Sequence, residues 1–314
     1  MILQLFLTAL GFVLPAKGAG VMVDGACSIA KRYKASDLTI GLTILALGTS
    51  APEFFVSTIS ALKGSSEIAL GNVLGSNIAN LCLVLGVAGV IVPIGVRREM
   101  VRRDLPFCLI VAVVLLAIIS LWNAEFVVSR WEAAALGLGL VVYLALMFST
   151  AEPSLIGESA GDSRKPAVAV VLVLGGLVAL ILGGELVVRS CVEMASRLGV
   201  SDALIGVTIV AIGTSLPELA ASVAAVLKGK PEMAIGNVVG SNILNTGLVL
   251  ASAAAIKPLA TDTSFVIDSL VAAAMSAFLL LFMFTGKKYN LDRWEAFIFL
   301  VAYVGYMGYV ISRR

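Results

Sequence analysis

No histidine occurs among the 314 residues of this chain. The sequence therefore lacks the commonest zinc ligand and the side chain that most often carries protons near neutral pH. Charged residues are also scarce, at 13% against roughly a quarter in a soluble domain, while hydrophobic residues reach 60% and the mean hydropathy is +1.04. A soluble fold cannot bury that much apolar surface, so the composition indicates an integral membrane protein.

The four cysteines, Cys27, Cys82, Cys108 and Cys191, stand singly in apolar stretches, without the paired spacing of a metal site or a disulfide framework. We expect them to pack in the core. The net charge of +2 is too small to indicate a nucleic-acid partner. The N-terminal run has no basic leader and no convincing cleavage site, which favours a retained first span over a removed signal peptide.

Apolar runs of the length that a membrane helix needs, about 20 residues, recur along the chain. Five expected spans, at 2–29, 37–62, 67–92, 105–123 and 127–149, precede a polar stretch from Glu152 to Pro166, and five follow it, at 167–195, 202–227, 232–256, 264–285 and 294–311. The expected fold is therefore an all-α polytopic membrane protein of ten transmembrane helices, in which there is no room for a sizeable soluble domain.

Residues 36–86 align without a gap with residues 201–251, and 29 of the 51 positions are identical. This degree of identity indicates an internal duplication, with a first repeat at 1–150, a linker at 151–166 and a second repeat at 167–314. Because each repeat has an odd number of spans, the second should enter the membrane inverted relative to the first, as in many secondary transporters.

Loop charges predict the orientation. The loops after the odd-numbered spans carry fourteen lysines and arginines, the other side carries six, and Lys17 and Arg189 lie within spans. The positive-inside rule then places the linker in the cytoplasm and both termini outside it.

Each repeat carries one glutamate near the middle of an apolar span: Glu53 in GTSAPE and Glu218 in GTSLPE. A charge at the bilayer centre costs a few kcal/mol, so it persists only beside a partner or in a wet cavity. Pro52 and Pro217 lack the amide hydrogen of a regular helix turn and should break both helices. Thr49 lies four residues before Glu53, on the same helix face.

The following spans contribute hydroxyl and amide groups at helical spacing. Ser76 and Asn80 lie one turn apart in the first repeat, as do Ser241 and Asn245 in the second. The candidate ligands are therefore all oxygens, with no sulfur or imidazole. Such a set with two carboxylates suits Ca²⁺, and Na⁺ is of similar size and binds the same oxygens. The chemistry alone also allows protons.

The motifs GTSAPE with GNVLGSNIAN, and GTSLPE with GNVVGSNILN, resemble the paired alpha-repeats of the sodium/calcium exchanger family, within the cation/calcium antiporter superfamily, in its compact prokaryotic form. The resemblance covers essentially the whole chain. It implies a ten-helix inverted-repeat fold with cation positions around Glu53 and Glu218 that open alternately to each side. It also implies that the first and sixth spans slide across the rest.

By this resemblance, the carbonyls of Thr49 and Thr214 join the two glutamates in lining the calcium position. The resemblance adds further sodium ligands: Ser50, Ser215, Ser76, Ser241, Asn80, Asn245 and the carbonyls of Ala46 and Ala211. Some relatives have an aspartate at the position of Asn245. These relatives include the ones that also carry potassium. In this chain Asn80 and Asn245 are both neutral, which weakens the case for potassium coupling and leaves the site with two carboxylates instead of three.

The function that follows is an antiporter of the plasma membrane, a monomer in the lipid bilayer, which extrudes Ca²⁺ from the cytoplasm against Na⁺ entry and needs no cofactor. The main alternative is a Ca²⁺/H⁺ antiporter that uses the same glutamates. An intramembrane hydrolase would need a nucleophile with a base, or paired aspartates, and neither is found beside the glutamates. A channel fits a duplicated midplane site with broken helices less well.

Overall fold

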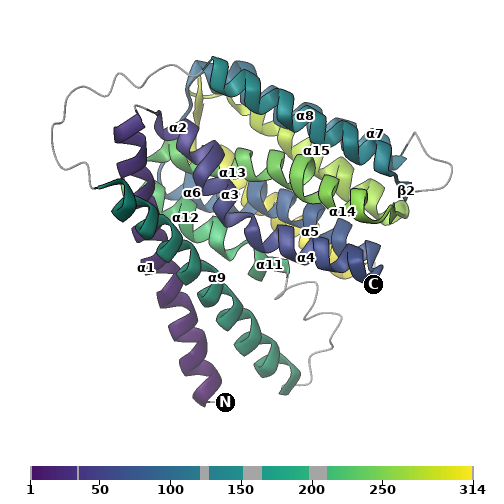
Figure 1. The fold of residues 1–314 in the computed structure, drawn as a ribbon, viewed down its shortest axis with the longest axis horizontal. Helices are drawn as coiled ribbons and strands as arrows, with labels where there is room; N and C mark the ends of the chain where they lie inside the picture. Colours follow the sequence, from purple (N-terminus) through teal and green to yellow (C-terminus); the bar gives the residue numbers. More distant parts are fainter. Residues whose placement is uncertain (1, 34, 121–126, 151–164, 198–210, 313–314) are drawn as a thin grey trace.

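The computed structural model describes residues 2–33, 35–120, 127–150, 165–197 and 211–312, and these are largely helical (Figure 1). The first half contains α1 (Ile2–Tyr33), α2 (Asp37–Ile40), η1 (Gly41–Leu45), α3 (Ala46–Thr49), α4 (Ala51–Lys63), α5 (Ser66–Ala79), η2 (Asn80–Val84), α6 (Leu85–Ile91), β1 (Ile94–Gly95), η3 (Met100–Asp104), α7 (Leu105–Ser120), β2 (Val127–Val128) and α8 (Arg130–Ser149), where η marks a π-helical stretch.

The second half contains α9 (Pro166–Arg197), α11 (Ala211–Thr214), α12 (Leu216–Leu227), α13 (Pro231–Leu244), η5 (Asn245–Leu250), α14 (Ala251–Ile256), β3 (Leu259–Ala260), α15 (Thr263–Phe282), β4 (Asn290–Leu291) and α16 (Arg293–Ser312). The beginning of the seventh expected span, residues 202–210, lies outside the described residues, and so does most of the linker.

Seven helical stretches of the described residues are long and apolar enough to cross a membrane, or eight if the bent pair Asp37–Thr49 and Ala51–Lys63 counts as one span. The multi-pass helical fold is therefore confirmed, while ten spans remain an expectation. Two ends differ from the sequence-based bounds by four residues or more. The first helix runs on to Tyr33 through Lys31 and Arg32, because basic side chains are favourable in a last turn. The fourth span begins at Met100.

Two continuous stretches form the centre of the bundle. Ser66–Ile91 and Pro231–Ile256 are 72% and 78% buried over their most apolar windows, whereas the other five candidate spans are 22% to 44% buried. These central stretches are the ones that carry the GNV motifs, so both motifs lie inside protein and not at the lipid-facing surface.

Many contacts between the two halves occur twice. β1 pairs with β4 and β2 with β3, both antiparallel. Arg293 donates to the carbonyl of Ile91 at the end of α6, and Arg130 donates to that of Ile256 at the end of α14. The duplicated sequence is therefore matched by duplicated contacts between the halves.

Glycine allows the first half to approach α13 closely. A Cβ on Gly236 would lie 2.8 Å from the Leu38 carbonyl oxygen, and one on Gly240 would lie 2.7 Å from the Leu42 carbonyl oxygen and 2.8 Å from the Ala46 Cβ. No larger residue fits there without a shift in backbone. This close packing presses the segment before Glu53 against the central helix of the second half.

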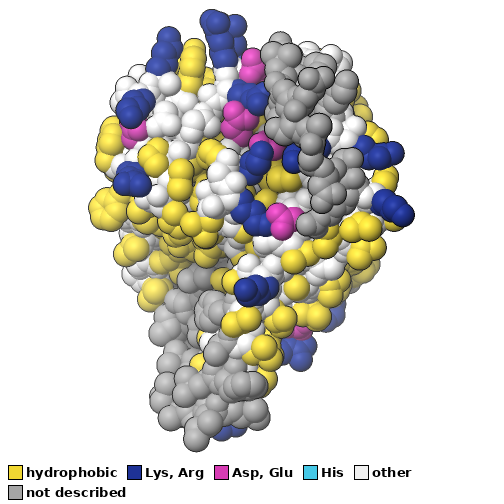
Figure 2. All heavy atoms as spheres, turned by 90° about the vertical axis from the view of Figure 1, so that its left-hand side faces the viewer, with side chains coloured by type: hydrophobic (Ala, Val, Ile, Leu, Met, Phe, Trp, Pro, Cys, Tyr) yellow, Lys and Arg dark blue, Asp and Glu magenta, His cyan; other side chains and the backbone are white. Residues whose placement is uncertain are grey.

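The helices α1 and α9 lie side by side outside the bundle (Figure 1), and α1 also contacts α12. At one end Lys228 donates to the Gly20 carbonyl at 2.6 Å and to Asp24 Oδ1 at 2.5 Å, and nearby Lys230 donates to Asp37 Oδ2 at 2.9 Å. Lysine and arginine side chains spread over this end of the molecule (Figure 2). The hydrogen bond to Asp37 raises the pKa of Lys230.

Candidate cation site

Both motif helices break at the serine two residues before the proline. α3 ends at Thr49 and α4 begins at Ala51, with a bend of 45°. Ser50 at this break has φ −81° and ψ 3°, and Ser215 between α11 and α12 has nearly the same angles, φ −89° and ψ 4°. The proline in the first turn of each following helix needs no partner for an amide hydrogen. The predicted breaks are therefore present in both copies.

Each break brings a glutamate to the start of a new helix. Glu53 and Glu218 lie in the first turns of α4 and α12, where the helix dipole favours a negative charge, and both are completely buried. Ser76 Oγ donates to Glu53 Oε1 at 3.3 Å. The other oxygen of Glu53 and both oxygens of Glu218 accept no hydrogen bond from the described residues.

The two glutamates lie near each other across the two halves. Glu218 lies close enough to Glu53 for their charges to interact, and Thr49 and Ser50 of the first half lie beside the Glu218 carboxylate without hydrogen-bond geometry to it. Thr49 Oγ1 also donates to Asn237 Oδ1 at 3.2 Å and lies 3.5 Å from Ser241 Oγ. The structure thus brings the motif residues of both copies to one place.

Oxygen atoms without hydrogen-bond partners are concentrated here. Within the described residues, seven of the twelve buried side-chain atoms without a hydrogen-bond partner belong to three pairs that the duplication relates: Ser50 and Ser215, Asn80 and Asn245, Glu53 and Glu218. A buried polar atom without a partner costs about 1–3 kcal/mol, and all of these atoms are oxygens. Cations bound at this place would give these oxygens partners. No group of three or more Asp, Glu, Cys or His side chains placed to hold a metal ion occurs in the described parts of the chain.

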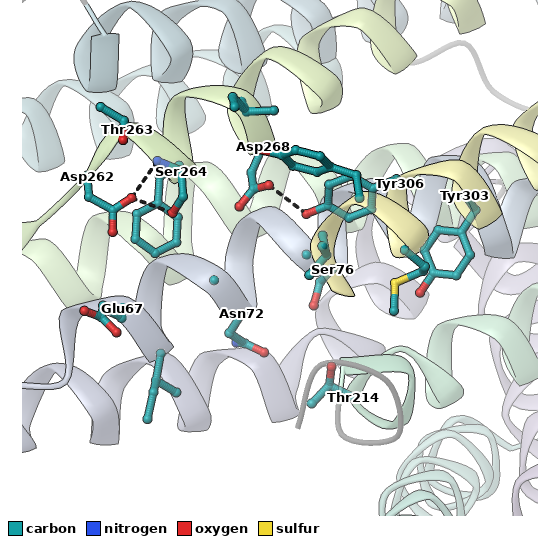
Figure 3. A pocket seen from close by; sticks show the side chains of 18 of the residues that line it. Glu67, Asn72, Ser76, Thr214, Asp262, Thr263, Ser264, Asp268, Tyr303 and Tyr306 are labelled. Carbon is teal, nitrogen blue, oxygen red and sulfur yellow. Dashed lines mark hydrogen bonds between the residues drawn. The ribbon is translucent and has the colours of Figure 1, made fainter. Parts of the chain in front are cut away.

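The remaining candidate ligands lie on the elements that surround the two glutamates. The Ala46 carbonyl accepts the Ser50 amide at 3.0 Å, which leaves its second lone pair. Ala211 is the first described residue after the gap and begins α11. Thr214 and Ser76 line a cavity of about 820 Å³ between α5, α15 and α16 (Figure 3).

Asn72 and Asn237, which belong to the motifs but not to the candidate ligands, act as braces. Asn72 Nδ2 donates to the Glu53 carbonyl at 3.2 Å and to Ser57 Oγ at 2.8 Å. Asn237 Nδ2 donates to Ser222 Oγ at 3.1 Å. These bonds hold each glutamate helix against the central helix of its own half.

One further pair of buried carboxylates was not predicted from the sequence. Asp104 accepts a hydrogen bond from the Tyr143 hydroxyl, and Asp268 accepts one from the Tyr306 hydroxyl, each at 3.0 Å. Asp268 and Tyr306 stand on the wall of the cavity (Figure 3). Extending the alignment of the repeats into the fourth and ninth spans with one gap would have revealed the pair, because the two aspartates are 164 residues apart and the repeats are offset by 165.

Comparison with known proteins gives consistent matches over the whole chain. The family described as sodium/calcium exchanger protein matches residues 3–149 and 168–312. A protein of Alkalimonas amylolytica named "Putative antiporter CaxA" is 39% identical over 99% of this chain and 100% of its own. Sodium/calcium exchanger MaX1 of Methanosarcina acetivorans is 31% identical over 95% of both chains. A structure of the sodium-calcium exchanger NCX_Mj, soaked with zero Na⁺ and Ca²⁺, aligns with a TM-score of 0.85 and 32% identity over 98% of both chains.

A polytopic helical protein with two buried carboxylates among neutral oxygen donors belongs to the class of membrane cation transporters. Within that class the chain belongs to the sodium/calcium exchanger protein family. It is an antiporter and not an enzyme, and the resemblance that the repeated motifs indicated is confirmed.

Proposed function

We propose that this protein exchanges Na⁺ for Ca²⁺ across the plasma membrane and normally extrudes Ca²⁺ from the cytoplasm. The observation that carries the proposal is the meeting of Glu53 and Glu218 in a fully buried place, where several carboxylate, hydroxyl and amide oxygens accept no hydrogen bond from the described residues. The relatives named as sodium/calcium exchangers support the choice of ions.

The charge of the site explains why the two ions would exchange. Glu53 and Glu218 together carry two negative charges when ionised, and Asn80 and Asn245 add none. One Ca²⁺ or two Na⁺ neutralise this charge, so the two loadings compete for the same oxygens. An empty site would leave two like charges buried together, which is costly. Each crossing of the membrane is therefore favoured with ions bound.

We further propose the division of ligands that the family resemblance implies. Glu53, Glu218 and the carbonyls of Thr49 and Thr214 hold Ca²⁺. Na⁺ uses the same glutamates together with neutral oxygens of both repeats: Ser50, Ser215, Ser76, Ser241, Asn80, Asn245 and the carbonyls of Ala46 and Ala211.

The architecture that we propose for this function is a pair of inverted five-helix repeats, 1–150 and 167–314, in a monomer. The doubled contacts between the halves, including the two strand pairs, support a two-fold relation between them. The excess of basic residues in the loops after odd-numbered spans supports a cytoplasmic linker and termini on the opposite side.

The test is uptake of radiolabelled Ca²⁺ into Na⁺-loaded vesicles that contain the unmodified protein, Glu53→Gln or Glu218→Gln. The matched control is Glu99→Gln, the same change at the exposed N-cap position of η3. We expect Na⁺-dependent uptake in the unmodified protein and the control, and its loss in both site variants. Unchanged uptake in the two site variants would refute the proposed site.

A second arm separates Na⁺ from protons. In Na⁺-free vesicles with a pH gradient alone, we expect no Ca²⁺ accumulation. Accumulation there, abolished by Glu53→Gln, would replace Na⁺ by H⁺ as the coupling ion and leave the candidate site in place.

A further inference from the structure

Four asparagines and a threonine form a hydrogen-bonded chain across the interface of the two repeats. Asn80 Nδ2 donates to Asn242 Oδ1 at 3.1 Å, and Asn245 Nδ2 donates to Asn77 Oδ1 at 3.2 Å. Asn242 Nδ2 donates to the Asn77 backbone carbonyl at 3.1 Å, and Asn77 Nδ2 donates to Thr246 Oγ1 at 3.2 Å. All five side chains are at most 6% exposed. Each candidate ligand asparagine is thus held by a residue of the opposite repeat.

The orientation of a ligand amide matters because its oxygen attracts a cation and its NH₂ group repels one. For Asn80 the partners determine this orientation. The backbone carbonyl of Asn77 can only accept, so Asn242 must present its Nδ2 there and its Oδ1 to Asn80. Asn80 must then donate with its own Nδ2, which leaves its Oδ1 as the atom without a hydrogen-bond partner among the described residues.

Thr246 determines the second orientation. Its hydroxyl donates its single proton to the Asn242 backbone carbonyl at 3.2 Å, so it can only accept from Asn77. Asn77 therefore turns its Nδ2 to Thr246 and its Oδ1 to Asn245. Asn245 donates with Nδ2, and its Oδ1 is likewise left without a described partner.

We propose that Thr246, Asn77 and Asn242 are positioning residues that make both ligand asparagines present oxygen, and not NH₂, to the bound cation. The inference rests on the proposed function, because it takes Asn80 and Asn245 as ligands. It goes beyond that function by adding three residues that need not touch the ion. The arrangement has one hydroxyl anchor, since the position equivalent to Thr246 in the first repeat is Leu81.

The first test removes the anchor. Thr246→Val keeps the shape of the side chain and deletes the acceptor of Asn77 Nδ2, so Asn77 and then Asn245 can turn over. Loss of such supporting hydrogen bonds typically weakens metal binding about 10-fold to 100-fold. We expect a loss of that size in Na⁺ affinity, measured as the Na⁺ concentration that displaces half of the radiolabelled Ca²⁺ bound by the purified protein in equilibrium dialysis. Thr246→Ser, which keeps the hydroxyl, should restore the affinity of the unmodified protein.

The second test asks for coupling that a purely structural role would not produce. An aspartate at position 245 can only accept, so it needs Asn77 to turn its Nδ2 toward it. The hydrogen bond from Asn77 Nδ2 to the Thr246 hydroxyl opposes this rotation of the Asn77 amide. Thr246→Val removes that hydroxyl, so the amide can rotate. Asn245→Asp should therefore change Na⁺ affinity more favourably, by about fivefold or more, in the Thr246→Val background than in the unmodified protein.

Equal effects of Asn245→Asp in both backgrounds, or equal affinities of Thr246→Val and Thr246→Ser, would overturn the inference while the proposed function stands. A purified unmodified protein that binds no Ca²⁺ would overturn the proposed site and the positioning role together. An unmodified protein that binds Ca²⁺ and does not release it to Na⁺ would overturn Na⁺ as the exchanged ion, which distinguishes failure of the proposed function from failure of the positioning role.

Discussion

Lys228 connects the outer helix pair to the bundle, and its two hydrogen bonds should contribute unequally to stability. Its Nζ donates to the Gly20 carbonyl of α1 at 2.6 Å and to Asp24 Oδ1 at 2.5 Å. The side chains of Lys228 and Asp24 are 33% and 49% exposed. At this exposure an ion pair contributes about 0.5 kcal/mol, whereas the bond to the carbonyl contributes about 1 kcal/mol.

Lys228→Gln should therefore lower the free energy of unfolding by about 1.5 kcal/mol, and Asp24→Asn by about 0.5 kcal/mol. The double variant should resemble Lys228→Gln alone, which gives a coupling of about 0.5 kcal/mol. Titration with sodium dodecyl sulfate in mixed micelles measures these differences. The coupling should disappear at high salt, because exposed charges are screened.

Two results would contradict this reasoning. One is a loss of stability in Asp24→Asn as large as that in Lys228→Gln, because Asp24→Asn keeps the hydrogen bond to the Gly20 carbonyl and Lys228→Gln removes it. The other is a coupling that is unchanged by salt. Arg189→Gln serves as the control, because Arg189 pairs only one turn away on its own helix, with Glu185, among the contacts of the described residues.

Three further predictions concern stability and pH. Gly240→Val should lower stability by about 1–3 kcal/mol and reduce Ca²⁺ binding, because even a Cβ there would press on the Ala46 segment; unfolding and dialysis of the variant measure both. Asp104→Asn should cost about 3 kcal/mol in the same unfolding assay, because Arg103 donates to this completely buried carboxylate at 2.7 Å. The bond to Asp37 raises the pKa of Lys230, so its stabilisation is present below the unfolded pKa of about 10.5 and is lost above the folded one. The stability difference between the unmodified protein and Lys230→Gln should thus be constant from about pH 6 to pH 9 and shrink at higher pH.

Much of the fold could be predicted from the sequence because its signals are local. Long apolar runs indicate membrane helices whatever their neighbours are, and Pro52 and Pro217 break a helix through their own missing amide hydrogens. The expected span at 67–92 corresponds closely to the continuous helical stretch Ser66–Ile91. Helix ends were less accurate, as at Met100, because the polar residues that begin the fourth span are stabilised by pairing within the protein.

The candidate site could be predicted in its members but not in its contacts. Helical spacing places Ser76 and Asn80 on one face, yet it does not say what that face meets. In the structure Ser76 bonds Glu53 of its own repeat, and Asn80 bonds Asn242 of the other. Asn72 belongs to the same motif, but its side chain donates to the Glu53 carbonyl and holds the Glu53 helix against α5.

The sequence by itself determined that the chain is a duplicated membrane protein with one buried glutamate in each copy. Composition, repeat identity and the proline breaks are properties of the linear sequence and do not depend on which helices pack together. Only the tertiary structure decided that the glutamates meet across the halves, that oxygens of both copies lie without described partners around them, and that Thr246 determines which way a remote amide turns. The physical reason is that hydrogen-bond partners are set by which helices touch, and these partners come from positions up to about 190 residues apart.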